Sequence, residues 1–76
     1  MKLPRYWLVG DRPVKAVATP EGGMDLLAWE WKTGAFVREM GYLTRVMTGM
    51  DPEVDEVDAA AFEAQCQRLR GRLRPS

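Results

Sequence analysis

Length, composition and charge narrow the functions open to this chain. Its 76 residues suffice for one domain and are too few for two. It has no histidine and a single cysteine, Cys66, so an internal disulfide is excluded and a structural metal site nearly so. Eleven basic residues balance eleven acidic ones, which disfavours nucleic-acid binding without forbidding it, because phosphate contacts usually draw on a basic excess.

The N-terminal third of the chain predicts two strands, each followed by a turn. Residues 5–9 are an aromatic and branched run that ends in Gly-Asp-Arg-Pro at 10–13, where the proline cannot donate to a sheet ladder. Residues 14–19 resume a strand-like composition. Pro-Glu-Gly-Gly at 20–23 is typical of a second turn, because proline presets one φ angle and glycine accepts a positive one.

The clearest strand pattern covers residues 24–31, where apolar side chains occupy both faces. Leu27, Trp29 and Trp31 point one way, and Leu26, Ala28 and Glu30 point the other. Lys-Thr-Gly at 32–34 then predicts a hairpin loop with glycine in the left-handed conformation, and the chain returns through residues 35–40.

The segment after this hairpin gives two conflicting signals. Phe36, Met40, Leu43 and Met47 recur at helical spacing. Gly41 and several β-branched residues oppose a helix, each with a modest penalty. We expect a strand over 35–40 and a short turn or strand over 42–47, with helix as the open alternative for the second piece.

The last segment predicts an amphipathic helix over residues 58–74. Asp58 is a good N-cap, and Val57 and Phe62 occupy the two positions of a hydrophobic staple. The apolar stripe of this helix recurs at intervals of four, three and four and consists of Phe62, Cys66, Leu69 and Leu73.

Together these segments predict a single α+β domain over residues 1–76. It would contain a small antiparallel sheet of about four hairpin-connected strands over 3–47, either open or curled like a barrel. A connector over 48–57 would lead to the C-terminal helix. No stretch approaches the roughly 20 apolar residues of a membrane span, and the N-terminus lacks a signal region. We therefore expect a cytoplasmic protein.

No motif predicts catalysis or a cofactor. Residues 51–63 hold only acidic charges and 68–74 only basic ones, a distribution that complements the dipole of the predicted helix. The acidic run lacks the glycine and glutamate that a calcium loop needs. Cys66 has no histidine or nearby base to activate it. We expect neither an enzyme nor a bound cofactor or metal.

The tryptophans are the most notable candidates for a functional surface. One helix can cover only one face of a sheet that is apolar on both, so the second face would either close into a barrel or meet another protein. Tryptophan is a favoured interface anchor. The candidate binding residues are Trp7, Trp29, Trp31 and Arg38, the last as a phosphate contact in the alternative below.

Three functions follow from these features. The first is a protein–protein interaction or regulatory module, expected to form a homodimer because so small a core usually needs a supplement. The second is a nucleic-acid-binding domain that stacks bases on Trp7 or Trp29 and contacts phosphates through Lys15, Lys32 and Arg38. The third is an inhibitor or immunity-type protein that uses the acidic stretch 51–58 against a basic site.

Overall fold

Alternating apolar residues in the first half of the chain build an antiparallel meander. The computed structural model describes residues 2–73, and the sheet order is β4-β3-β2-β1-β5. The predicted antiparallel sheet is confirmed, and it is open rather than closed into a barrel. Its first four strands are β1 (Arg5–Val9), β2 (Arg12–Ala18), β3 (Met24–Trp29) and β4 (Phe36–Arg38).

A fifth strand lies within the stretch that we expected to be a connector. β5 (Val54–Val57) pairs antiparallel with β1, from Tyr6 opposite Val57 to Val9 opposite Val54. Its two central residues are acidic and exposed, so the strand lacks the apolar alternation of a half-buried strand. The sheet therefore has five strands rather than about four, and β5 forms the edge opposite β4.

The ambiguous segment after β4 is helical. Met40–Tyr42 form a short 3-10 helix, η1, and Leu43–Thr48 form the α-helix α1, which ends at Gly49 in the left-handed conformation. This corrects the expected turn or strand over 42–47. The helical spacing outweighs the β-branched penalties because Met40, Leu43 and Val46 all pack on the sheet.

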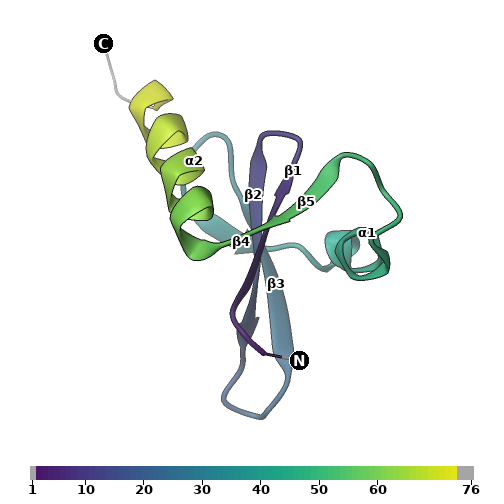
Figure 1. Ribbon diagram of the computed structural model, residues 1–76. Coiled ribbons are helices and arrows are strands. Elements are labelled where there is room, and N and C mark those ends of the chain that lie inside the picture. Colours follow the sequence, from purple (N-terminus) through teal and green to yellow (C-terminus); the bar gives the residue numbers. More distant parts are fainter. Residues whose placement is uncertain (1, 74–76) are drawn as a thin grey trace.

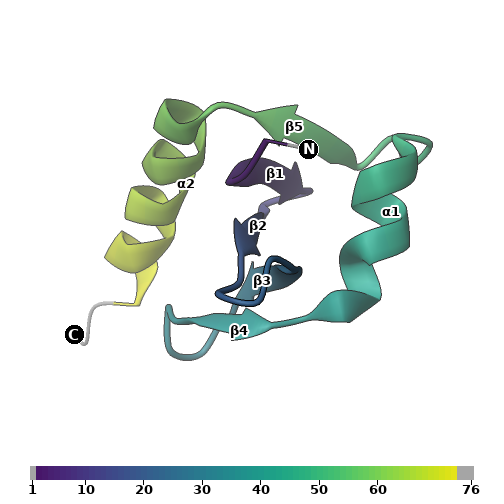
Figure 2. The same ribbon diagram turned by 90° about the horizontal axis from the view of Figure 1, so that it is seen from below.

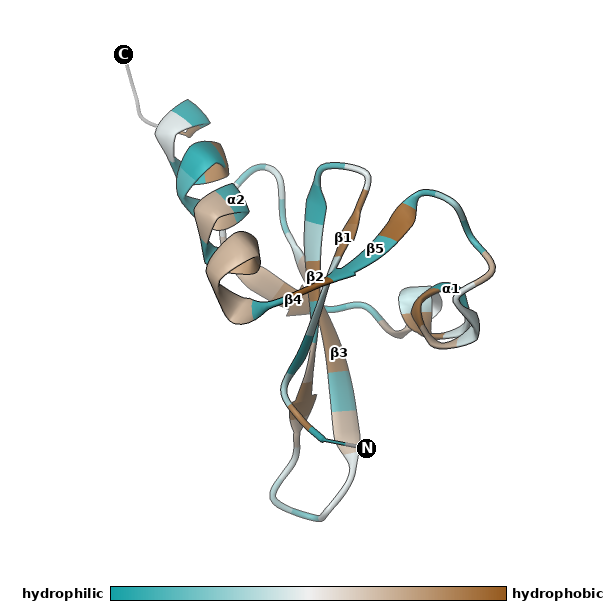
Figure 3. Ribbon diagram, in the orientation of Figure 1, coloured by the Kyte–Doolittle hydropathy of each residue, from teal (hydrophilic) through white to brown (hydrophobic). Residues whose placement is uncertain are grey.

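The two α-helices cover opposite faces of the sheet. Figure 2 shows the five strands stacked in the middle, with α1 on one side and α2 on the other. Under α1 lies a cluster centred on Trp7, Val14, Leu26 and Val46. In Figure 3 brown segments alternate with teal ones along the strands, and the last turns of α2 are mostly hydrophilic in colour. The expectation that one helix leaves the second face uncovered is therefore corrected.

The C-terminal helix matches its prediction closely. α2 (Ala59–Arg72) begins after Asp58, whose carboxylate accepts a hydrogen bond from the Ala61 N–H at 2.8 Å. Val57 and the four residues of the predicted stripe pack with Trp29 on the face of the sheet opposite α1. In Figure 1 the helix lies beside the sheet on the side away from α1. Residue 74, the predicted last residue, lies outside the described residues.

The loop between β3 and β4 fixes the far end of α2. Gly34 has φ of 73°, the left-handed conformation that the sequence predicted. A Cβ atom at this position would lie 2.5 Å from Cδ1 of Leu73 and 3.4 Å from the Trp29 ring. Glycine therefore lets the loop pass under the last turn of the helix. None of the helices within residues 2–73 is long and apolar enough to cross a membrane.

Candidate functional site

The structure divides the four predicted binding residues between core and surface. Trp7 and Trp29 are each 1% exposed and lie on opposite faces of the sheet, under α1 and α2 respectively. Trp31 is 47% exposed, just beyond the end of β3. Arg38 is exposed on β4, where its Nε donates to Asp25 at 3.1 Å. Only Trp31 and Arg38 are therefore placed to meet a partner, and both belong to the β3–β4 hairpin.

This hairpin also carries the exposed apolar surface of its sheet edge. Among the described residues, the large hydrophobic side chains that are exposed are Trp31, Val37 and Met50. Val37 belongs to β4, and Trp31 lies in the loop between β3 and β4. We call Trp31 together with strand β4 (Phe36–Arg38) the β4 edge. Exposed aromatic and branched residues beside the open side of an edge strand are typical of a surface that other chains contact.

The hydrogen-bond phase of β4 leaves backbone groups free along this edge. The Glu30 N–H donates to the carbonyl of Ala35, and the Glu39 N–H donates to the carbonyl of Leu26. Hydrogen-bonded pairs alternate along an antiparallel ladder, so the backbone N–H and C=O groups of Val37 point towards β3. The N–H and C=O groups of Phe36 and Arg38 therefore point away from the sheet.

The opposite edge is protected by charge. β5 presents Asp55 and Glu56, both exposed, and Glu53 immediately precedes the strand. Acidic side chains on an edge strand repel a second copy of the same strand. β4 carries one charged residue, Arg38, whose charge is offset by Asp25. Glu56 and Glu53 are also paired, with Arg5 and Arg45, but Asp55 takes part in none of the ion pairs found within residues 2–73. Of the two edges, β4 therefore carries the smaller uncompensated charge.

The acidic stretch 51–58 is largely engaged within the chain. Asp51 and Glu53 form ion pairs with Arg45, at 2.7 and 3.8 Å, and Asp58 caps α2. Arg5 donates to both carboxylate oxygens of Glu56, each at 2.8 Å. These contacts reduce the charge that the inhibitor hypothesis would offer to a basic partner.

We expect acid to weaken the pairing of β1 and β5. The hydrogen bonds from Arg5 hold the pKa of Glu56 below its ordinary value of 4.5. A lowered carboxyl pKa contributes stability that is complete above the unfolded value and is lost as pH falls through the folded value. The loss should be under about 1 kcal/mol, because the pair is partly exposed.

Thermal melts from neutral to strongly acidic pH measure this effect. Glu56→Gln should show a smaller fall in melting temperature with acid than the unaltered chain, while Asp55→Asn should retain the full fall. A Glu56→Gln profile parallel to that of the unaltered chain would show that the pair contributes nothing.

A second surface feature lies where β2 meets η1 and α1. Pro13, in β2, has no N–H to offer to β3, and the carbonyl of Trp29 instead accepts a hydrogen bond from Nε of Arg12 at 2.7 Å. The same guanidinium donates from Nη1 to the hydroxyl of Tyr42 at 2.9 Å. The arginine is half-buried and is held by two neutral acceptors.

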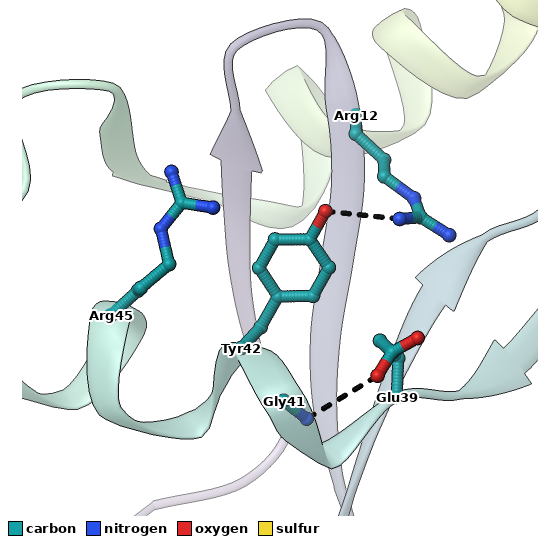
Figure 4. Close-up of a pocket in the computed structure, with 5 residues that line it drawn as sticks. All are labelled: Arg12, Glu39, Gly41, Tyr42 and Arg45. Carbon is teal, nitrogen blue, oxygen red and sulfur yellow. Dashed lines mark hydrogen bonds between the residues drawn. The ribbon is translucent and has the colours of Figure 1, made fainter.

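Arg12 and Tyr42 line an open cavity of about 280 Å³, together with Glu39, Gly41 and Arg45. We call this cavity the Arg12 pocket. In Figure 4 the Tyr42 ring stands between Arg12 and Arg45, and Glu39 lies on the Arg12 side. Both guanidinium carbons are 5.4 Å from the centroid of the ring. No sequence pattern links these residues, because they come from separate elements and match no motif.

Two further candidates from the sequence, Cys66 and Lys15, lie on the α2 side of the sheet. Cys66 is fully buried on the inner face of α2, and burial raises the pKa of its thiol, as expected for a small core residue. The ammonium group of Lys15 lies 4.4 Å from the centroid of the Phe36 ring. Within residues 2–73 no group of three or more carboxylate or thiol side chains is arranged to hold a metal ion.

Comparison with known proteins gives no relative from which a function could be transferred: no family model, curated protein or solved structure matches the chain.

Proposed function

We propose that the protein is a small interaction module that forms a homodimer by pairing two β4 edges. The observation that carries the proposal is that exposed Trp31 and Val37 lie on one hairpin with an edge strand whose outer side is unpaired. The apolar sheet faces no longer support self-association, since α1 and α2 cover them. The proposal therefore rests on the edge.

The hydrogen-bond phase of β4 suits a two-fold axis through Val37. In an antiparallel pair centred on this residue, the free N–H and C=O groups of Phe36 would meet those of Arg38 in the second copy. The two Val37 side chains would form the close, non-hydrogen-bonded pair at the axis. Arg38 of each copy would stand beside Phe36 of the other. This places each cation near an aromatic ring rather than opposite the Arg38 of the second copy.

Backbone and side-chain contributions can be separated at Arg38. The N–H of this residue points away from β3, so Arg38→Pro removes an outward donor and leaves the ladder to β3 intact. Arg38→Ala is the matched control, because it loses the same side chain and keeps the donor. We expect sedimentation to show a dimer for the unaltered chain and for Arg38→Ala, and a monomer for Arg38→Pro.

A second variant keeps the test decisive if the proline disturbs folding. Val37→Lys places two like charges at the axis of the dimer and should also give a monomer with an unchanged circular dichroism spectrum. An unaltered chain that is monomeric with a Kd weaker than about 1 mM contradicts the proposal. So does a dimer that survives both Arg38→Pro and Val37→Lys, because another surface would then hold it.

A further inference from the structure

The Arg12 pocket contains two side chains of opposite charge that do not pair with each other. Among residues 2–73, Arg12 donates hydrogen bonds to the carbonyl of Trp29 and the hydroxyl of Tyr42 alone. Glu39 accepts a long hydrogen bond, 3.4 Å, from the N–H of Gly41. Neither takes part in the ion pairs found within residues 2–73. Each charge therefore faces the cavity without a counter-ion from the described part of the chain.

The third charged residue of the pocket is already compensated. Arg45 donates to Asp51 at 2.7 Å and lies 3.8 Å from Glu53. Arg12, by contrast, uses two of the five N–H donors of a guanidinium and has three left. The available groups of the pocket are thus one cationic fork and one carboxylate.

We propose that the Arg12 pocket binds a small zwitterion, a ligand with a carboxylate and an ammonium group a few bonds apart, as in a free α-amino acid. Arg12 would bind the carboxylate through its remaining donors, a geometry that suits planar oxyanions. Glu39 would accept the ammonium group. This inference is independent of the homodimer, because the pocket and the β4 edge share no residue.

The size and lining of the pocket favour this class over simpler ions. A cavity of about 280 Å³ is near the lower end of ligand sites, so it suits a small molecule. The ring of Tyr42 supplies an apolar wall for the carbon skeleton of the ligand. Inorganic phosphate would meet the negative charge of Glu39, and a simple amine would meet the positive charge of Arg12.

Titrations followed by nitrogen-15 amide spectra test the proposal with defined probes. Glycine, leucine and glutamine represent the zwitterions, and acetate, methylammonium and inorganic phosphate represent ions that carry charge of one sign only. We expect at least one amino acid to give saturable shifts at the amides of Gly41 and Tyr42. Each probe with charge of one sign should bind at least about tenfold more weakly, a difference of about 1.4 kcal/mol.

Glu39→Gln provides the specific variant, because it removes the charge and keeps an acceptor for the N–H of Gly41. We expect it to weaken amino-acid binding about tenfold and to leave acetate binding no weaker. Glu21→Gln makes the same change at an exposed turn and should have no effect. The proposal is overturned if no amino acid gives saturable shifts, if acetate or phosphate binds as tightly as the amino acids, or if Glu39→Gln binds them unchanged.

Discussion

Replacing Trp29 with alanine is expected to lower the free energy of unfolding by about 3–5 kcal/mol. The side chain is 1% exposed and makes an edge-to-face contact with Phe36, with ring centroids 5.6 Å apart. It also packs with Phe62 and Leu69 from α2. A domain of this size is typically stable by only about 4–11 kcal/mol. The loss is therefore a large share of the total, and the variant should unfold at a much lower urea concentration.

Trp31→Ala is the matched control, because it removes the same side chain two residues later on the surface. At a protein concentration low enough for the chain to be monomeric, we expect its free energy of unfolding to stay within about 0.5 kcal/mol of the original value. Urea titrations followed by far-ultraviolet circular dichroism measure both variants. Equal losses at the two positions would contradict the division of the tryptophans into a core residue and a surface residue.

The sequence was most informative where all the local signals agreed. In α2 the N-cap, the staple and the stripe all favour the same helix, and Asp58 and Phe62 take the positions that they predict. The turn glycine Gly34 was equally clear, because few other residues accept its φ angle. Local chemistry determined these elements without help from the rest of the fold.

Two elements could not be predicted because tertiary contacts determine them. β5 consists of two valines around two acidic residues, and it is a strand because β1 offers it a free edge. α1 carries β-branched residues that disfavour a helix in isolation. It is helical because Val46 and its neighbours cover the face of the sheet that contains Trp7. Missing this helix led to the expectation of an uncovered apolar face.

The two candidate sites differ in the same way. Trp31 was found because tryptophan is a favoured interface residue, whatever its position in the sequence. The sequence could not tell that Trp31 is exposed and Trp29 is buried. The Arg12 pocket was missed because Arg12 and Tyr42 are thirty positions apart and come together only when the folded chain brings η1 beside the first residue of β2. The one local signal was Pro13. Because proline has no N–H, the carbonyl of Trp29 is left free to accept a hydrogen bond from Arg12.

Placing a charge at Val46 tests the covering of the second sheet face by α1. Val46 is 4% exposed and packs in the cluster that contains Trp7 and Leu26. Val46→Asp would bury an unpaired carboxylate, so we expect a loss of about 4 kcal/mol or more in the free energy of unfolding. Against a total of about 4–11 kcal/mol, the variant should lose its cooperative thermal transition or show it at a much lower temperature.

Thr44→Asp provides the comparison, because it adds the same charge to the same short helix on its exposed side. An acidic residue in the first turn of a helix is neutral or favourable, so this variant should melt close to the original temperature. If α1 were detached from the sheet, both positions would face solvent and the two variants would be equally stable. A large difference between them therefore requires that α1 packs on the sheet and covers the face that contains Trp7.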